Sequence, residues 1–147
     1  MNFLWVFILV YVAMIATSFW EAYSEGRNSW SKGKLGWKKK FLGIEITAYH
    51  FFLFVIMYPA LLALPLIVSG WNAELFWILV IAYITGLVIE DFFWYVVNPA
   101  VKLKEFYTSF SDYYPWIRIG KKKQKIVPVF YVVAIVLAAI IWIWLVK

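Results

Sequence analysis

Four long apolar runs dominate the chain, and short polar segments separate them. The runs cover approximately residues 3–24, 42–68, 73–97 and 126–146. Each is long enough to cross the hydrocarbon core of a bilayer as a helix, which takes about 20 residues. We therefore predict an all-α integral membrane protein in which residues 1–147 form one transmembrane domain. Its four helices would pack as a bundle in up-down order.

Local signals support these four helices. Asn72 is placed to cap the third helix, and Asn98 and Pro99 would end it. Pro59 lies inside the second run, where a membrane helix tolerates it as a kink, and Pro128 falls in the first turn of the fourth. No Lys or Arg precedes the first run, so we expect a retained helix and not a cleaved signal peptide.

The basic residues orient this bundle. Thirteen of the 14 Lys and Arg lie in the two polar connections, approximately residues 25–41 and 98–125. Both connections lie on one side of an up-down bundle, and the positive-inside rule makes that side cytoplasmic, with both termini outside. We expect the plasma membrane of a prokaryote. The second connection is also rich in aromatic residues, which predicts an aromatic and basic segment lying at the membrane interface.

Composition agrees with lipid as the solvent. The chain is 65% hydrophobic and only 15% charged, which leaves too little polar surface for a water-soluble globule. Its net charge of +6 favours anionic lipid headgroups as partners and not nucleic acid, because the basic residues flank apolar spans. Candidate headgroup ligands, which otherwise serve only as topology signals, are Arg27, Arg118, Lys121, Lys122 and Lys123. The absence of cysteine excludes disulfides and thiol chemistry.

Ionisable residues inside the spans are the candidate chemistry. Glu21 ends the first span, His50 lies near the start of the second, and Glu90 and Asp91 lie about two turns before the end of the third. At a rise of about 1.5 Å per residue, His50 and Glu90 lie at a similar depth. Such side chains cost on the order of 2–3 kcal/mol in a membrane, so they usually face the bundle interior and pair. We expect one polar layer near the cytoplasmic face.

Helical spacing assigns faces to this layer. Adjacent residues point about 100 degrees apart on a helix, so we expect Glu90 to face the layer and Asp91 to point elsewhere. The fourth span offers Tyr131, Ala134 and Ala138 as a packing wall with nothing that ionises near neutral pH. Residues near the layer along these helices are predicted to support it: Ser18, Glu25, Thr47, Trp94 and Asn98.

Three interpretations of the layer stay open. Glu21, His50, Glu90 and Asp91 could ligate a divalent metal ion, although no known ligand spacing fixes the set. Glu90 and His50 could instead act as a catalytic acid and base without metal, or the layer could be a structural hydrogen-bond network.

The function that best fits the layer is a metal-dependent or acid–base site acting on a lipid or isoprenoid at the cytoplasmic face. The alternatives are a non-catalytic subunit of a larger membrane complex and a small transporter coupled to a cation or proton. Stripes of Gly and Ala could also serve self-association into a homo-oligomer. Whether the chain is an enzyme stays open at this point.

Overall fold

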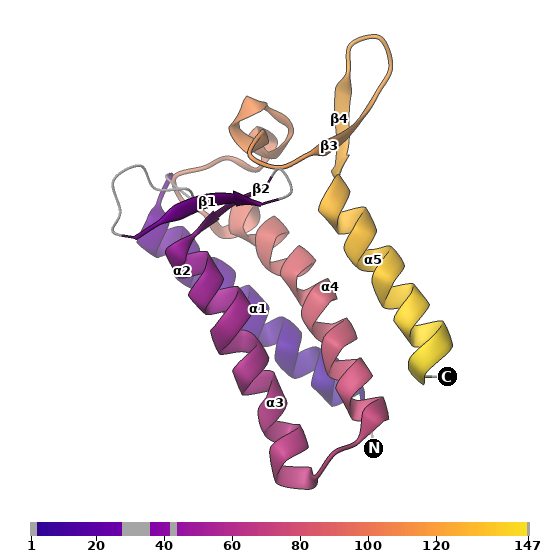
Figure 1. Cartoon of the computed structure of the whole chain (residues 1–147). Coiled ribbons are helices and arrows are strands. Elements are labelled where there is room, and N and C mark those ends of the chain that lie inside the picture. Colours follow the sequence, from indigo (N-terminus) through magenta and orange to yellow (C-terminus); the bar gives the residue numbers. More distant parts are fainter. Residues whose placement is uncertain (1–2, 28–35, 42–43, 147) are drawn as a thin grey trace.

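The computed structural model describes residues 3–27, 36–41 and 44–146, and it is mostly helical (Figure 1). Within these ranges, four helices are long and apolar enough to cross a membrane. The spans are α1 (Leu4–Glu25), a continuous second helix made of α2 (Ala48–His50), η1 (Phe51–Met57) and α3 (Tyr58–Ser69), then α4 (Ala73–Val97), and a fourth made of α5 (Val129–Ile141) and η4 (Trp142–Val146). The prediction of four long apolar helices is confirmed.

Two β-hairpins correct the all-α prediction in the connections. Strand β1 (Lys38–Phe41) pairs antiparallel with β2 (Ile44–Thr47), so the second helix begins at Ala48 and not near residue 42. Strand β3 (Trp116–Ile119) pairs with β4 (Gln124–Pro128), so the fourth helix begins at Val129 and not at residue 126. The residues just before Ala48 and Val129 are apolar enough to be predicted as helix. Their backbone groups are satisfied instead by pairing with a neighbouring strand.

The helices are arranged around α4, which lies between α3 and α5, with α1 packed along its length (Figure 1). A close approach of backbones makes the α1–α4 contact possible. A Cβ added at Gly86 would lie 3.0 Å from Met14 Cγ and 3.4 Å from Val10 Cγ1. Ala82 and Ser18 are fully buried in the same contact region, so small residues set the distance between the two helices.

A widened turn in the second helix accommodates Pro59. The segment Phe51–Met57 has π-helical hydrogen bonding, in which the Tyr58 N–H donates to the Leu53 carbonyl. Proline has no N–H, so the next carbonyl in this register, that of Phe54, has no donor from within the helix. The Tyr83 hydroxyl of α4 donates to the Phe54 carbonyl. The proline kink expected from the sequence is therefore a π turn whose exposed carbonyl is satisfied by the neighbouring helix.

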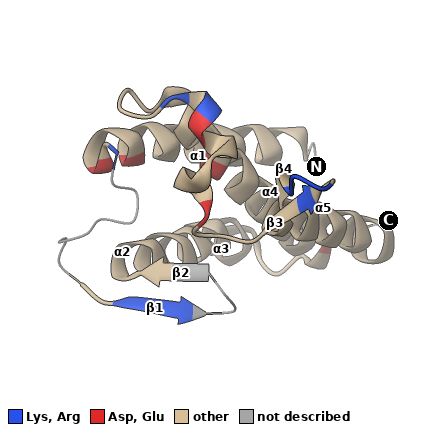
Figure 2. Cartoon of the chain, turned by 90° about the horizontal axis from the view of Figure 1, so that it is seen from above, with Lys and Arg blue, Asp and Glu red and all other residues tan. Residues whose placement is uncertain are grey.

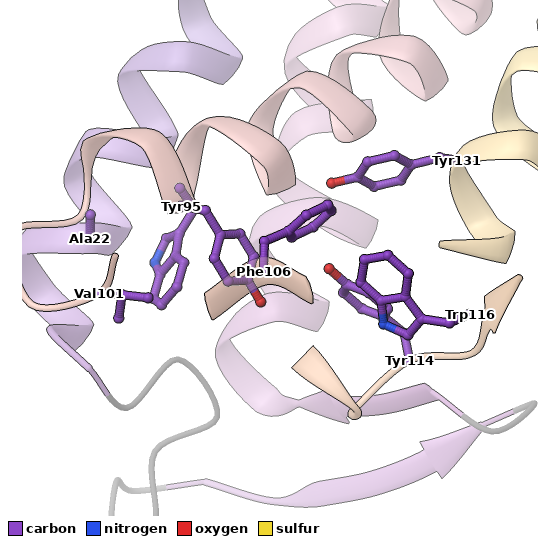
Figure 3. Packing of buried hydrophobic residues seen from close by; sticks show 8 residues of the cluster. Ala22, Tyr95, Val101, Phe106, Tyr114, Trp116 and Tyr131 are labelled. Carbon is purple, nitrogen blue, oxygen red and sulfur yellow. The ribbon is translucent and has the colours of Figure 1, made fainter. Parts of the chain in front are cut away.

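The connection between α4 and α5 folds into an aromatic cap. It contains the short turns η2 (Leu103–Tyr107) and η3 (Ser109–Ser111), followed by the β3–β4 hairpin. Phe106 lies at its centre, with ring centroids 4.9 Å from those of both Tyr95 and Trp116 (Figure 3). The predicted interfacial segment is thus a packed unit on the end of the bundle, and its depth relative to lipid stays a prediction.

The polar connections lie at one end of the bundle and the α3–α4 turn lies at the other (Figure 1). The start of α1 and the end of η4 share the end that holds the α3–α4 turn. Lys and Arg gather on β1 and on the β3–β4 hairpin, at the capped end (Figure 2). This arrangement has the up-down order that the sequence predicts, and the assignment of the capped end to the cytoplasm stays a prediction.

Candidate functional site

A cavity of about 420 Å³ lies among the four spans below the aromatic cap. Its residues change character along the bundle axis. Near the cap it is lined by ionisable side chains, and toward the middle of the bundle by apolar ones. The ionisable lining residues are Glu21, Glu25, His50, Glu90 and Asp91, and the apolar ones include Phe54, Val55, Ile84, Leu87, Val133 and Leu137. The cavity therefore contains all four residues of the predicted polar layer.

On one side of the cavity, α1 presents two carboxyl groups one turn apart. The Tyr49 hydroxyl donates to Glu21 Oε1 at 2.5 Å and lies 2.9 Å from Glu25 Oε1, so it bridges the pair. Both glutamates are buried. Tyr49 precedes His50 on the same short helical turn. Its role is not predictable from the sequence, because a tyrosine near the end of a span is typical of an interfacial anchor.

Glu90 reaches this side of the cavity from α4. Its backbone carbonyl accepts a hydrogen bond of 2.8 Å from Ser18 Oγ, which ties the helix of Glu90 to that of Glu21. The carboxyl groups of Glu90 and Glu21 are close enough to interact electrostatically. Its Oε1 atom has no hydrogen-bond partner among the described residues, and neither has the indole Nε1 of Trp94, one turn further along.

Asp91 lines the same cavity from its other side, so the prediction that Glu90 alone faces it is wrong. The Tyr131 hydroxyl donates to Asp91 Oδ2 at 2.5 Å, and the Tyr114 hydroxyl lies 3.3 Å from the same atom. Burial and the nearby Asp91 carboxylate raise the pKa of Tyr114, so this cap hydroxyl stays a neutral donor. The cavity spans the roughly 100 degrees between the two carboxylates because α1 and α5 flank α4 on different sides.

The role of Tyr131 also corrects the expectation that the fourth span is a plain wall. Tyr131 is buried, and its phenol is the closest donor to Asp91. The hydroxyl contact leaves no local signal in the sequence, because it joins residues 40 positions apart.

His50 enters the cavity from the start of the second span. Thr47 Oγ1 lies 2.5 Å from His50 Nδ1, and the same oxygen accepts from the His50 backbone N–H at 3.4 Å. The imidazole ring also packs against Tyr49, with 4.1 Å between ring centroids, and against Phe54. Thr47 therefore both caps the helix and holds one nitrogen of the imidazole.

The supporting residues divide into two groups. Ser18, Glu25, Thr47 and Trp94 lie at the cavity or bond to residues that do. Asn98 does not line the cavity, because its Nδ2 donates to the Gly26 carbonyl at 2.7 Å at the end of α1.

The geometry gives no support to the predicted metal site. Within the described ranges, no three His, Asp or Glu side chains are placed so that they could hold a metal ion. Glu21 and Glu90 meet on one side of the cavity, Asp91 is bonded to tyrosines on the other, and His50 Nδ1 is bonded to Thr47. The four residues share a cavity without converging on one point, as a metal centre requires.

The basic residues outside the spans have different surroundings. Arg27 makes a two-point contact with Glu105, at 3.2 Å and 2.5 Å, and donates to the Ala100 carbonyl. This contact lowers the pKa of Glu105 to about 2. Arg118 pairs with Asp112 at 2.7 Å on the exposed hairpin.

Three exposed lysines, Lys121, Lys122 and Lys123, form the tip of the β3–β4 hairpin after Gly120, whose φ of 75° suits glycine. Of the other predicted headgroup ligands, Arg27 pairs with Glu105 and Arg118 pairs with Asp112. Lipid binding by any of the five stays a prediction.

The cavity can supply proton donors and acceptors at one end and an apolar surface at the other. No known protein family, curated protein or solved structure matches the chain.

Proposed function

We propose that this chain is a membrane-embedded enzyme whose acid–base site acts on a lipid or isoprenoid. One observation carries the proposal: a single cavity joins a cluster of ionisable side chains, including Glu90 and His50, to an apolar surface among the helices. An amphipathic substrate has the same division, with a polar end where the chemistry occurs and an apolar chain.

The apolar walls suit a chain that enters from the bilayer. Val55 on the second span is 50% exposed and Leu137 on α5 is 47% exposed, and both line the cavity. Helix α5 packs against α4 on the side away from α3 (Figure 1). Accessible apolar side chains on both flanks support lateral entry of a hydrocarbon chain, with its polar end against the carboxyl groups.

Glu90 and His50 are the proposed acid and base. Carboxyl groups that meet, as those of Glu90 and Glu21 do, can hold a proton between them and exchange it with a bound substrate. Thr47 holds Nδ1 of His50 and so orients the imidazole for acid–base chemistry. Positioned acid–base groups of this kind contribute about 10²–10⁴-fold to a rate.

The test is turnover of natural lipids by the purified protein. Wild type, Glu90→Gln and Glu74→Gln are reconstituted separately in nanodiscs with a total bacterial lipid extract, and lipids are compared by mass spectrometry over time. Glu74 is an exposed carboxylate in the first turn of the same helix, far from the cavity, so it is a matched control. We expect one lipid to be consumed by wild type and Glu74→Gln and spared by Glu90→Gln. Equal consumption by Glu90→Gln, or none by wild type, would overturn the proposal.

A cation-coupled or proton-coupled transporter receives less support from the structure. Beyond the cavity, polar side chains in the described spans are mostly hydroxyls bonded to neighbours, such as Tyr11 with Thr85 at 2.9 Å and Tyr58 with Thr17. Apart from Glu74 at the helix end, the half of the described bundle that holds the α3–α4 turn has no ionisable acid or base of the kind that relays a proton.

A further inference from the structure

Two polar atoms of α4 that lack hydrogen-bond partners indicate the kind of ligand that the cavity would bind. Glu90 Oε1 is an acceptor and Trp94 Nε1 is a donor, and neither has a hydrogen-bond partner among the described residues. The two side chains are 6% and 4% exposed, and both line the cavity. Residues four apart on a helix lie on one face, with Cβ atoms about 6 Å from each other. Glu90 and Trp94 are therefore neighbours on one face of α4.

Unpaired buried groups of this kind are costly. Leaving a buried donor or acceptor without a partner costs about 1–3 kcal/mol, and folded proteins contain few of them. The side-chain hydroxyls of Ser18, Thr17 and Tyr58 in the same bundle all make hydrogen bonds. The missing partners of Glu90 and Trp94 are therefore not a general feature of the described bundle. A ligand that satisfies both atoms must present a donor to Glu90 and an acceptor to Trp94.

The charge of the lining identifies the donor. Glu21, Glu25, Glu90 and Asp91 line the cavity, and among the described residues no Lys or Arg does. An acidic lining favours a cation, and an ammonium group is the cationic hydrogen-bond donor that lipids commonly carry. The same lining contains the aromatic residues Trp94 and Phe130, a residue type that attracts cations.

The acceptor must suit the same surroundings. A phosphate oxygen could accept from Trp94, but its negative charge would lie among carboxyl groups with no described basic side chain other than His50 in the lining. A neutral hydroxyl oxygen accepts the indole N–H without that repulsion. The apolar walls formed by residues such as Val133 and Leu137 then take a hydrocarbon chain.

We infer that the cavity binds a long-chain amino alcohol, an amphiphile whose head carries an ammonium group beside an unphosphorylated hydroxyl. The ammonium group donates to Glu90 Oε1, and the hydroxyl accepts from Trp94 Nε1. The inference deepens the proposed function, because it names the substrate class of that same site. The ammonium and the hydroxyl of the head group thus each have one hydrogen-bond partner on α4.

The test uses four probes with one chain length: a vicinal amino alcohol, the amine without the hydroxyl, the alcohol without the amine, and the amino alcohol phosphorylated on its hydroxyl. Each competes with a photoactivatable amino alcohol for crosslinking to the full chain in phosphatidylcholine nanodiscs. In wild type we expect the amino alcohol to bind best, with the amine and the phosphorylated probe weaker and the alcohol weakest. A charge-assisted hydrogen bond corresponds to roughly 10–100-fold in affinity and a neutral one to roughly 3–10-fold.

Two variants assign the contacts. Glu90→Gln should weaken both unphosphorylated amine probes at least tenfold and leave the alcohol unchanged. Trp94→Phe should remove the advantage of the amino alcohol over the amine, because only the indole N–H distinguishes them. Glu74→Gln and Trp71→Phe, at exposed positions near the other end of the bundle, should preserve the wild-type order.

Several outcomes would overturn the inference. Equal binding of all four probes by wild type would contradict the inference. This outcome needs no variant, so it does not depend on whether a variant folds. A phosphorylated probe that binds as well as the free amino alcohol identifies a phospholipid head instead. Since binding is measured without turnover, selective binding by a protein that converts no lipid would sink the proposed enzyme and leave this inference standing.

Discussion

Glu90 and Asp91 are adjacent in the chain and line one cavity, yet the two sides of that cavity treat them differently. On the α5 side, Asp91 receives two tyrosine hydroxyls, one from α5 and one from the cap. On the α1 side, Glu90 meets another carboxyl group and keeps one oxygen without a partner. A carboxylate that is held by two hydroxyl groups serves the fold, whereas one with a buried oxygen that lacks a hydrogen-bond partner is available to a ligand.

The largest expected effect follows directly from this contrast. Glu90→Gln should reduce lipid turnover by roughly 10²–10⁴-fold with little loss of folded protein, because it removes a proposed acid–base group. Asp91→Asn should reduce turnover by a few-fold at most and should lower the thermal unfolding midpoint. Turnover rates and unfolding curves in the same nanodiscs check both variants. Equal rates in the two variants would show that the cavity does not distinguish its two sides.

The α1 side depends on a close helix contact, which can be forced apart. Gly86→Val should destabilise the bundle by about 1–3 kcal/mol, because the new methyl groups meet Met14 and Val10. Separating α1 from α4 should also separate Glu21 from Glu90. Ala60→Val, on an exposed face of α3, is the matched control and should change stability little. Unfolding in detergent measures the difference, and equal stability of the two variants would contradict the close-contact argument.

The α5 side can be weakened by one hydroxyl. Tyr131→Phe should destabilise the protein by roughly 1–2 kcal/mol, since it leaves Asp91 with the more distant Tyr114 hydroxyl alone. Tyr107→Phe removes a hydroxyl from an exposed tyrosine of the cap and should have no measurable effect. If Tyr131→Phe proved as stable as Tyr107→Phe, the hydroxyl would not be what holds Asp91.

The smallest effect concerns a contact outside the cavity, between Arg27 and Glu105. Hydrogen bonding with Arg27 lowers the pKa of Glu105 from 4.5 to about 2. The contribution of this contact to stability is therefore complete above pH 4.5 and is lost as pH falls toward 2. Arg27→Gln should flatten the fall in unfolding midpoint across that window, and Lys104→Gln should leave it unchanged. A wild-type slope that survives in Arg27→Gln would place its origin elsewhere.

The sequence predicts the parts of this structure that local signals determine. The third span runs from Ala73 to Val97 as predicted, because Asn72 caps it through a 2.8 Å bond to the Leu75 N–H and Asn98 ends it. The starts of the second and fourth spans were misplaced because strand pairing depends on segments elsewhere in the chain. An apolar β-strand that leads into a helix has no polar boundary to mark the change.

The candidate site was predictable in its residues and not in its bonding. Depth along the helices correctly placed Glu21, His50, Glu90 and Asp91 around one cavity. The tyrosines that bond to them, Tyr49, Tyr114 and Tyr131, were not separable from other aromatic residues of a membrane protein by type or position. A metal centre looked reasonable from the residue types, and only the bonding of each side chain argues against it.

The π turn before Pro59 acts as a one-residue insertion in the second helix. A helix advances by about 100 degrees per residue, so each extra residue rotates everything before it relative to everything after it. Ala48–His50 is therefore turned relative to α3 from the direction that an uninterrupted α-helix would give. Deleting one residue between Phe51 and Met57 would restore the regular helix and swing His50 away from the carboxyl groups. The helical register set by this π turn, and not only the identity of residue 50, places the imidazole in the cavity.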